Sequence, residues 1–454
     1  RTDQLISKLK EVAGKATFIR DRVKLEAYAL DGKRPKVIVS PRTVEEISGI
    51  VAYANEQRLA VVPMGNGTKT AVGGAPKKLD LVLQTTRLNR IIDCDVENLT
   101  LTAQSGITLS QVQRLLAKEG KGYFVPLDPP FTEKATLGGI LASNSSGPKR
   151  LLYGTARDLV IGMKAVFPNG DIIVSGGKTV KNVSGYDMCK LLIGSFGTLG
   201  IISEVTLRLL PLPEAEASLL LPFGSIEEAD GFVQEIGRSQ LLPAAVETLN
   251  ALAVKKLRYD LPLPSEGNYL VAIGVEGVAE STERQMVEMG HMGRKRGALE
   301  VITLKSERHV AFWNALRDFS KGLGKKYPGY VTLKSNFLVS KCGQMMGRYE
   351  KLAQGLGIDC ALISHSGSGI LYAYVLREDG SQSGIEVLIR FIKKLTSEAA
   401  KNEGNTIIES SPPSVKKRVN PWGKPLGDVV VMRRIKREID PRGILSPGRF
   451  VGGI

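Results

Sequence analysis

The N-terminal part of the chain alternates short apolar runs with amphipathic stretches, a pattern that predicts strands joined by helices. The predicted strands are 37–40, 60–62 and 81–83. Between the first two, residues 44–55 have the periodicity of an amphipathic helix, and Thr43 and Glu46 stand at the spacing of a capping box. The pattern predicts a small βαβ unit. A loop that follows its second strand would lie at the carboxyl edge, where open α/β sheets bind ligands.

The pattern changes after residue 98. Residues 160–167 and 171–174 flank the dipeptide Asn169-Gly170, which suits the left-handed positions of a tight turn and predicts a hairpin. The other elements predicted here are strands at 99–103 and 201–208 and helices at 108–117, 136–142 and 188–193. The pair Gly138-Gly139 would let a large flat molecule approach the backbone closely, or would serve tight helix–sheet packing.

Pro211 and Pro213 separate this region from a stretch rich in Glu and Ala, which favours helices, and we place a domain boundary near residue 212. Amphipathic helices such as 385–400 then separate short apolar runs, which predicts an antiparallel sheet backed by helices. Examples of these runs are 269–275, 299–303, 331–334, 360–364 and 370–375. A C-terminal segment with a helix at 429–438 follows, and the predicted fold class is α+β.

The loop after the second predicted strand carries four glycines between Val61 and Ala75. Because glycine lacks a Cβ, Gly65 and Gly67 can present several backbone N–H groups to one anion. A Walker loop is excluded, because Ile172 stands where the run 177–179 (GKT) would need its first glycine. A Rossmann fingerprint is excluded, because Thr70 occupies the place of its third glycine. The residues leave two interpretations, a pyrophosphate-binding loop and a plain surface turn.

The composition describes an ordinary globular protein of two or three domains: 454 residues, 43% hydrophobic and 24% charged. No apolar run approaches the roughly 18 residues of a membrane span. The opening RTDQLISKLKEV predicts an amphipathic helix rather than a signal peptide, which favours the cytoplasm. The cysteines are far apart, which excludes zinc knuckles and cysteine-ligated iron–sulfur clusters and favours buried thiols in a reducing compartment. They are Cys94, Cys189, Cys342 and Cys360.

The formal net charge is +16. The basic residues are scattered and aromatic residues make up only 6%, so no stacking platform for nucleic acid is visible and we expect no nucleic-acid partner. The charge fits a solvated basic surface, or attraction to an acidic protein, a membrane surface or an anionic substrate.

Four motifs in order along the chain resemble the FAD-binding domain of the vanillyl-alcohol-oxidase superfamily. They are PMGNGTKT, then DPP…ATLGGILASNSSG…YGTARDLV, then KNVSGYD, then GSFGTLGIISEVTLRL. The ending MRRIKREIDPRGILSPGRFVGGI resembles the glycolate oxidase and D-lactate dehydrogenase branch. The resemblance covers nearly the whole chain. It implies a two-part PCMH-type FAD-binding domain at 1–212, an α/β cap or substrate domain with an antiparallel sheet at 213–404, and a C-terminal segment at 405–454 that returns to the FAD domain.

The resemblance also implies which residues bind FAD. The pyrophosphate contacts, mostly backbone N–H groups, fall on Met64, Gly65, Asn66, Gly67, Thr68 and Lys69. The ribityl chain and flavin ring fall along Pro129, Thr136, Gly138, Gly139, Ser143, Asn144 and Gly147, and the same side is closed by Tyr153, Gly154, Asp158 and Val160. The adenine end falls on Gly197, Gly200, Ile201 and Ile202. Arg449 stands where the family's closing Pro-Gly-Lys or Pro-Gly-Arg returns to the flavin domain.

The three histidines are His291, His309 and His365, so residues 1–212 contain none. A histidyl–flavin bond from the FAD-binding domain is therefore impossible. Cys94 and Cys189 do not fall in motifs that suggest a thioether link. We expect non-covalent FAD.

Oxidation of a 2-hydroxy acid needs a cation for the carboxylate, a base or metal for the hydroxyl, and an α-carbon that faces flavin N5 for hydride transfer. Arg317 sits where relatives place an arginine near the substrate, and Lys334 is a second candidate cation. The alternative is that both residues form surface salt bridges.

Metal-dependent relatives carry G-H-x-G-D-G-N-x-H and a later Glu-His-Gly. Here the first motif keeps His365 but has Ser368 for its acid and Tyr372 for its second histidine, and the second motif reads Glu409-Ser410-Ser411. One imidazole and one carboxylate make a poor metal site, since such sites usually need three protein ligands. We therefore expect no metal, with His365 and Glu409 as the only candidate ligands.

Two functions follow from the resemblance. The first is a metal-independent FAD-dependent 2-hydroxyacid dehydrogenase of the glycolate or lactate type, in which His365 or Tyr372 activates the hydroxyl and electrons pass to a partner protein. The second is a non-catalytic FAD-carrying electron-transfer subunit of a larger glycolate or lactate dehydrogenase complex. Its partners would be a sister flavin subunit and an iron–sulfur or other electron-transfer subunit, and it would be cytoplasmic or held at a membrane through them.

Overall fold

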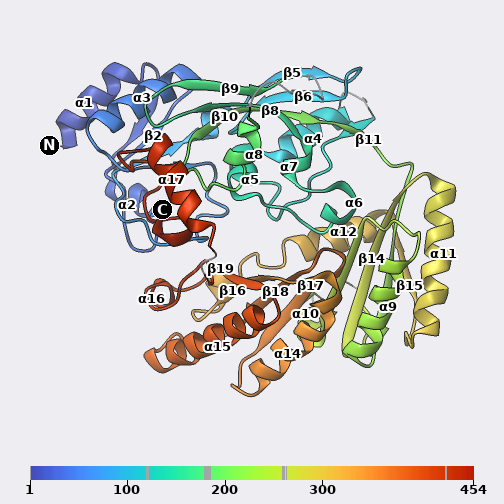
Figure 1. The fold of residues 1–454 in the computed structure, drawn as a ribbon. Helices are drawn as coiled ribbons and strands as arrows, with labels where there is room; N and C mark the ends of the chain where they lie inside the picture. Colours follow the sequence, from blue (N-terminus) through green and yellow to red (C-terminus); the bar gives the residue numbers. More distant parts are fainter. Residues whose placement is uncertain (1, 119–121, 178–185, 258–260, 262, 425–426) are drawn as a thin grey trace. The chain divides into compact units, whose positions relative to one another are not determined.

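The computed structural model describes residues 2–118, 122–177, 186–257, 261, 263–424 and 427–454. The chain forms two compact units (Figure 1). The first contains Arg1–Ser146, Gly154–Pro211 and Pro425–Ile454, and the second contains Gly147–Tyr153 and Leu212–Lys424. In the described ranges, no helix combines the length and the apolar character needed to cross a membrane.

The first sheet of the first unit has four strands in the order β1-β2-β4-β3, the last three of them parallel. Its strands are β1 (Thr17–Ile19), β2 (Val37–Ser40), β3 (Val61–Met64) and β4 (Leu81–Gln84). Helices α1 (Thr2–Val12) and α3 (Val44–Glu56) bury their apolar faces against it, and α2 (Arg22–Glu26) lies between β1 and β2 in the chain. The predicted βαβ unit is confirmed, with the glycine loop at the carboxyl end of β3.

Helix α3 starts with only half of the expected capping box. The Thr43 side chain accepts a hydrogen bond from the Glu46 amide at 3.2 Å. The Glu46 carboxylate does not return to Thr43. Instead it accepts from the amides of Lys15 (2.7 Å) and Arg42 (2.6 Å), and so also fixes the chain before β1.

The second sheet of this unit has five antiparallel strands in the order β5-β6-β10-β8-β9. They are β5 (Ile91–Asp95), β6 (Thr100–Gln104), β8 (Val160–Val166), β9 (Ile172–Gly176) and β10 (Ile201–Arg208). Its helices are α4 (Leu109–Lys118), α5 (Leu137–Ser143), α7 (Ala156–Leu159) and α8 (Met188–Leu192), which with the sheet form one apolar core. Strands β7 (Tyr123–Phe124) and β11 (Leu210–Pro211) pair separately. The predicted hairpin is confirmed as β8 and β9.

The C-terminal residues complete the first unit. The Val61 amide donates to the Ile444 carbonyl, and the Ser446 amide donates to the Val61 carbonyl, so the tail runs parallel to β3. Helix α17 (Val429–Ile439) is held by Lys436, whose buried ammonium donates to Asp440 (2.6 Å) and to two backbone carbonyls, those of Thr198 and Leu445. A buried ammonium with this many acceptors anchors the helix to the loop before β10.

The second unit is an antiparallel sheet of eight strands in the order β15-β12-β14-β13-β17-β18-β16-β19. They are β12 (Ala215–Phe223), β13 (Ala245–Asn250), β14 (Tyr269–Gly277), β15 (Ile302–Lys305), β16 (Val331–Asn336), β17 (Cys360–His365), β18 (Ile370–Val375) and β19 (Asn405–Ser410). The predicted antiparallel sheet backed by helices is confirmed.

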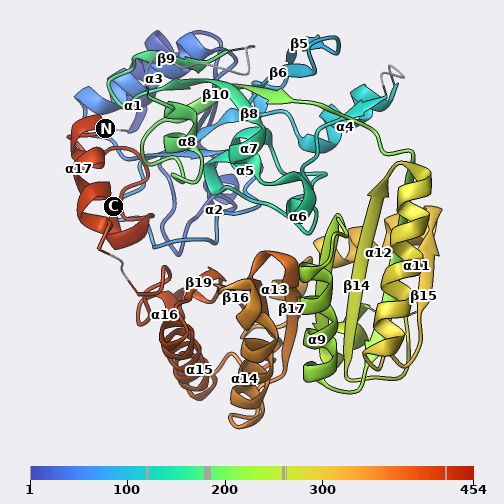
Figure 2. The same cartoon turned by 45° about the vertical axis from the view of Figure 1, so that its right-hand side comes forward.

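Four helices cover one face of this sheet in the spatial order α11, α9, α14, α15 (Figure 2). They are α9 (Ile226–Arg238), α11 (Ala279–Lys295), α14 (Cys342–Gln354) and α15 (Gln382–Lys401). The opposite face packs against α10 (Ala251–Leu257) and α12 (Ser306–Arg317). We call it the polar face, because it also carries the charged candidates described below. The short helices α6 (Arg150–Tyr153), α13 (Leu323–Lys326) and α16 (Pro413–Lys416) complete the unit.

The structure differs from the sequence-based prediction in three details here. Residues 215–223, rich in Glu and Ala at their start, form β12 instead of a helix, because this strand is buried between β14 and β15. Strands β13 and β19 were not predicted. The strand predicted at 299–303 begins only at Ile302.

Asp80 joins the start of β4 to its neighbours. Its side chain is almost fully buried and accepts from the ammonium groups of Lys36 (2.7 Å) and Lys78 (2.8 Å) and from the Ala60 amide (2.8 Å). Burial alone would raise the pKa of Asp80, but these hydrogen bonds outweigh it and leave the pKa below its ordinary value of 3.8.

We expect Asp80→Asn to lower the free energy of unfolding at pH 7 by about 1–3 kcal/mol, because a buried hydrogen-bonded charge is lost. A carboxylate whose folded pKa is depressed contributes stability above its unfolded pKa and loses it as the pH falls through the folded value. The gap between wild type and variant should therefore narrow as the pH falls below 3.8, the ordinary pKa of an aspartate. Urea denaturation at pH 7 and at successively lower pH values measures the gap, and hydrogen exchange in β3 and β4 locates the loss, with exposed Glu97→Gln as control. A gap that stays constant as the pH falls would contradict this prediction.

Candidate functional site

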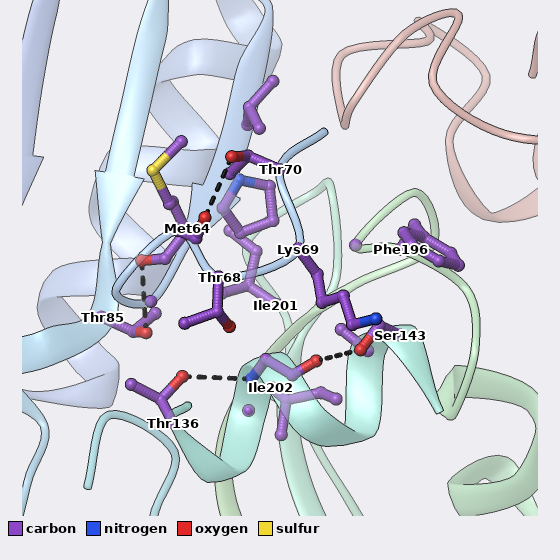
Figure 3. Close-up of a pocket in the computed structure, with 18 of the residues that line it drawn as sticks. Met64, Thr68, Lys69, Thr70, Thr85, Thr136, Ser143, Phe196, Ile201 and Ile202 are labelled. Carbon is purple, nitrogen blue, oxygen red and sulfur yellow. Dashed lines mark hydrogen bonds between the residues drawn. The ribbon is translucent and has the colours of Figure 1, made fainter. Parts of the chain in front are cut away.

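A hollow opens in the first unit where the glycine loop meets α5 and the start of β10 (Figure 3). Its predicted lining residues are Met64, Gly65, Asn66, Gly67, Thr68, Lys69, Thr136, Gly138, Gly139, Ser143, Gly197, Gly200, Ile201, Ile202 and Arg449. It is also lined by residues that were not among the predicted contacts: Val62, Pro63, Thr70, Thr85, Ala142 and Phe196. The strand–loop–helix arrangement therefore brings the three expected FAD segments together around one hollow.

Three glycines of the lining are needed for close packing. A Cβ on Gly65 would lie 2.2 Å from Thr136 Oγ1, and one on Gly138 would lie 2.9 Å from Ser105 Cβ. Gly197 has a positive φ of +66°, and its Cβ would lie 2.5 Å from Pro63 Cγ. The glycines let the loop, the helix and the 194–200 segment approach one another, and they leave a cradle of backbone that a dinucleotide could follow.

The amides at the start of α5 are already used within the protein. Leu137 and Gly138 donate to the carbonyls of Ile107 and Ser105, and Gly139 donates to Thr136 Oγ1 at 3.2 Å. Helix α5 therefore supplies shape and side-chain hydroxyls to the hollow rather than these three amide donors. The glycine loop remains the expected source of N–H groups for a pyrophosphate.

Arg449 braces the glycine loop from the C-terminal side. Its guanidinium is buried and donates to the carbonyls of Gly74 (3.0 Å) and Thr70 (2.7 Å), while the Gly74 amide donates back to the Arg449 carbonyl (3.0 Å). Burial lowers the pKa of Arg449, an effect that Asp31 at 3.7 Å opposes. On the other side of the loop, the Asn66 amide group donates to the Lys134 carbonyl at 2.9 Å. The loop is thus held at both ends of its turn.

The remaining predicted FAD residues do not line this hollow. They are Pro129, Asn144, Gly147, Tyr153, Gly154, Asp158 and Val160. Asp158 is engaged in a capping box with Thr155 at the start of α7, and Gly154, with φ +78°, leaves room for that carboxylate. The YGTARD motif thus has a local structural role of its own. The first five residues of the KNVSGYD motif, 181–185, lie outside the described residues.

Gly147 and Tyr153 belong to a segment that packs within the second unit. Lys149 Nζ lies 2.5 Å from the buried Glu276 carboxylate and 3.2 Å from Glu216. The Tyr153 hydroxyl donates to the same Glu276 carboxylate, and burial followed by this hydrogen bond raises the pKa of Tyr153 well above its ordinary value. This network anchors the segment to strands β12 and β14.

The polar face of the eight-stranded sheet carries a buried acid–base pair that the sequence did not predict. Glu247 on β13 lies directly across from His365 on β17, and both of its oxygens lie close to His365 Nδ1, at 2.6 and 2.8 Å. Glu247 is fully buried. Because an ionised carboxylate only accepts, Nδ1 carries the proton in the neutral ring and Nε2 keeps the lone pair.

Two further predicted residues adjoin this pair. The Tyr372 ring packs edge-on to His365 with centroids 5.2 Å apart, and Lys334, its partner across β16 and β18, places Nζ 5.8 Å from the Tyr372 centroid. Burial raises the pKa of Tyr372 well above 10, so at neutral pH its phenol is a proton donor rather than a base. The structure therefore brings His365, Tyr372 and Lys334 together with Glu247.

The other two candidates, Arg317 and Glu409, lie on different elements, α12 and β19. Arg317 is the last residue of α12, and its guanidinium donates to the Asp318 carboxylate at 3.3 Å. Two residues later in the chain, the ring centroid of Phe319 lies 4.7 Å from that of Tyr374 on β18. Glu409 lies on the edge strand β19 beside β16 and adds to the negative field that raises the pKa of Tyr372. Across the described ranges, no three or more His, Cys, Asp or Glu side chains come together as a metal site would require.

Comparisons with known proteins match both halves of the chain. Residues 35–176 match the family described as FAD binding domain, and residues 212–450 match FAD linked oxidases, C-terminal domain. The chain belongs to the FAD-linked oxidase family. It is an FAD-dependent oxidoreductase of the type that acts on CH–OH donors, as the resemblance predicted, and the glycine-lined hollow is compatible with FAD.

The curated relatives are similar over nearly their full length. The chain is 31% identical to the glycolate oxidase subunit GlcD of Bacillus subtilis, over 99% of this chain and 97% of that protein. It is 31% identical to a D-lactate dehydrogenase of Archaeoglobus fulgidus, over 91% of each. It is 28% identical to a D-2-hydroxyglutarate dehydrogenase of Xanthomonas citri pv. viticola, over 99% of this chain and 97% of that protein.

The solved structures agree on the fold. p-Cresol methylhydroxylase matches with a TM-score of 0.80 at 17% identity, over 98% of this chain and 96% of that one. 4-Ethylphenol oxidase from Gulosibacter chungangensis matches with a TM-score of 0.76 at 16% identity, with the same coverage. The predicted two-part PCMH-type FAD-binding fold is confirmed.

We expect Gly65→Ala to weaken FAD binding at least about tenfold, or about 1.4 kcal/mol, because the new methyl group would displace the loop from Thr136. Fluorescence of free FAD after equilibrium dialysis measures the dissociation constant. Gly177→Ala is the matched control, because it lies in the same unit and a Cβ there meets none of the described residues within 4 Å. Equal FAD affinities in the two variants would contradict the packing role of Gly65.

Proposed function

We propose that this chain is a metal-independent 2-hydroxyacid dehydrogenase of the glycolate or lactate type. The observation that carries the proposal is the buried Glu247–His365 pair, with Tyr372 and Lys334 beside it on the same sheet face. It supplies a base, a proton donor and a cation, the groups that a 2-hydroxy acid requires. Relatives named as glycolate oxidase subunit, D-lactate dehydrogenase and D-2-hydroxyglutarate dehydrogenase support the substrate class.

In this proposal His365 Nε2 accepts the hydroxyl proton of the substrate. Glu247, buried against Nδ1, stabilises the imidazolium that results and keeps the ring in the productive tautomer. Lys334 pairs with the substrate carboxylate, with Arg317 as the second cation, and the Tyr372 phenol donates a hydrogen bond. FAD, when bound, supplies the acceptor for the hydride that leaves the α-carbon.

We also propose how the cofactor is held. The loop residues 64–69 would bind the pyrophosphate, and Thr136, Ser143, Gly197 and Ile202 would line the rest of the path, without a covalent bond. Asn144, Gly147, Tyr153 and the other predicted contacts outside the hollow remain proposals for the flavin end of the cofactor. The division at residues 212 and 404 remains part of the same proposal.

A second function is favoured by the altered metal motif. Ser368 and Tyr372 stand where metal-dependent relatives have an acid and a histidine, and no three-ligand cluster appears in the described ranges. The chain would then be a non-catalytic FAD-carrying subunit that passes electrons between a sister flavin subunit and an iron–sulfur or other electron-transfer subunit. In either function we place it in the cytoplasm, or at a membrane through such partners.

Anaerobic titration of the FAD-loaded protein separates the two functions. We expect glycolate, D-lactate, L-lactate or D-2-hydroxyglutarate to bleach the flavin absorbance near 450 nm in the presence of a metal chelator, since the proposed base is an imidazole. Retained FAD with no bleaching by any of the four acids would reject the dehydrogenase and favour the accessory subunit.

With the acid that bleaches fastest, we expect Glu247→Gln to lower the limiting rate of flavin reduction by about 10²-fold, because the imidazolium loses its counter-charge. The acid concentration for half-maximal rate should change much less, since Glu247 does not touch the carboxylate. Stopped-flow absorbance measures both. Glu350→Gln is the control, because it removes another carboxylate of the same unit that bonds Tyr269 and Asn250. Similar losses in both variants would point to general destabilisation instead.

A further inference from the structure

The second unit repeats one order of strands and helices twice. The first repeat runs β12, α9, β13, β14, α11, β15, and the second runs β16, α14, β17, β18, α15, β19. In each repeat the last strand pairs with the first at an outer edge of the sheet, and the two repeats meet where β13 pairs with β17. Helices α11 and α15 are therefore equivalent, and so are the edge strands β15 and β19.

The second repeat covers its own edge strand. The segment 411–424, which follows β19, turns back and runs antiparallel along it. The Ile408 amide donates to the Pro421 carbonyl at 2.7 Å, and the Asn405 side chain donates to the Trp422 carbonyl at 3.0 Å. The outer edge of β19 thus finds hydrogen-bond partners within the same chain.

The same segment also packs against α15. Its short helix α16 buries Val415 in the apolar core below. Two residues after this helix, the Arg418 guanidinium donates to both carboxylate oxygens of Glu386, near the start of α15. A bidentate pair of this kind fixes the direction as well as the position of the segment.

The first repeat leaves the equivalent place open. A groove of about 450 Å³ lies between α11 and β15, and its lining comes from α11, the start of β12 and 301–305. After β15 the chain continues into α12 on the opposite face of the sheet. Among the described strands, β15 pairs only with β12. Thr303 on β15 and Val287 on α11 are both exposed in this groove, Val287 by 54%.

The groove also carries the counterpart of the acid that holds Arg418. Glu386 is the fifth residue after Ser381, the N-cap of α15, and Glu283 is the fifth residue after Val278, the N-cap of α11. Glu283 lines the groove and is exposed. The first repeat therefore presents the same carboxylate at the same place, without a segment of this chain to follow β15 across it.

The other charged side chains of the lining favour one direction for a bound segment. Glu216 already pairs with Lys149 at 3.2 Å, and the long Lys305 side chain can keep its ammonium in solvent. His291 and Arg294 lie near the end of α11, beside the start of β15, because α11 leads into that strand. A segment antiparallel to β15 would thus meet Glu283 first and Arg294 last.

We propose that the groove between α11 and β15 docks a segment of a partner protein with the chemistry of 411–424. This segment supplies a branched apolar side chain to α11, an arginine to Glu283, a backbone to the outer edge of β15 and a C-terminal carboxylate to Arg294. Addition of an extended segment to a free sheet edge is a recurring mode of protein recognition. The proposal holds for either of the two functions considered above.

A second copy of this chain fits the groove less well. Pairing of β15 with its own copy would place two α11 helices four strand spacings apart, or about 19 Å. Packed helices lie about 8–10 Å apart, so the space above the two edge strands would stay unfilled. A segment that lies over β15 fills it, as α16 does beside α15.

The test uses the chain's own covering segment as a probe. The probe is a synthetic peptide of residues 411–424, SPPSVKKRVNPWGK, with a free C-terminus and an N-terminal fluorescein. The FAD-loaded full-length protein is titrated into it, and fluorescence anisotropy measures the dissociation constant. Glu283→Arg reverses the charge in the groove. Glu280→Arg is the matched control, because Glu280 is exposed on the same helix and does not line the groove.

We expect the wild type and Glu280→Arg to bind the peptide equally, and Glu283→Arg to bind it about tenfold more weakly. A peptide with Arg418→Glu should bind the wild type weakly and regain affinity for Glu283→Arg, since opposite charges then meet again. A variant that had merely lost its fold would not be rescued in this way. Amidation of the peptide C-terminus should weaken binding to the wild type, because the charge that faces Arg294 is removed.

Three results would overturn the proposal: no binding of the peptide by the wild type, equal binding by Glu283→Arg and Glu280→Arg, or no rescue by the peptide with Arg418→Glu. Sedimentation velocity tests the other occupant. A dimer of the wild type that Glu283→Arg dissociates, without peptide binding, would assign the groove to a second copy of this chain. None of these results depends on reduction of the flavin by a hydroxy acid, so the proposed function can fail while the docking groove stands.

Discussion

The contact between Gly65 and Thr136 is the constraint on which the cofactor site depends. The two residues approach so closely that the loop after β3 has no room for even one methyl group against the cap of α5. This contact joins the parallel sheet of the first unit to the helix α5 of its antiparallel sheet. The hollow lies beside this contact, between the loop and the helix. Asn66 and Arg449 then hold the loop from opposite sides. The site is therefore shaped by packing within the protein before any ligand is considered.

Local signals predicted most of the first unit. The strands β2, β3, β4 and β10 and the helix α3 were visible because apolar runs, caps and turn residues specify them within a few neighbours. The glycine loop could also be predicted, because its sharp turn and close approach to α5 require glycine, which the sequence shows directly. Its use as an FAD site came from the resemblance, since residue types alone left a surface turn as an alternative.

What the sequence could not reveal depends on pairing between distant residues. Glu247 is a single acid in an apolar run, and only the register of β13 against β17 places it opposite His365, 118 residues later. The strand β12 was mistaken for a helix because its first residues favour one, while its burial between two strands comes from the rest of the sheet. The Gly138-Gly139 pair left close approach of a flat molecule and tight packing as alternatives, and only the fold shows that the first amides of α5 donate to Ser105, Ile107 and Thr136. In each case a tertiary contact decides the outcome.

The return of the tail to β3 has a consequence for how the protein is made. Ser446 bonds to Val61, so the first sheet gains its last neighbour only from residues near the C-terminus. On the ribosome, the eight strands of the second unit emerge before that neighbour exists, and they can fold while the first unit is still incomplete. The nascent chain therefore cannot close the Arg449 brace over the glycine loop until the whole second unit has been synthesised. The FAD hollow is complete only after that point.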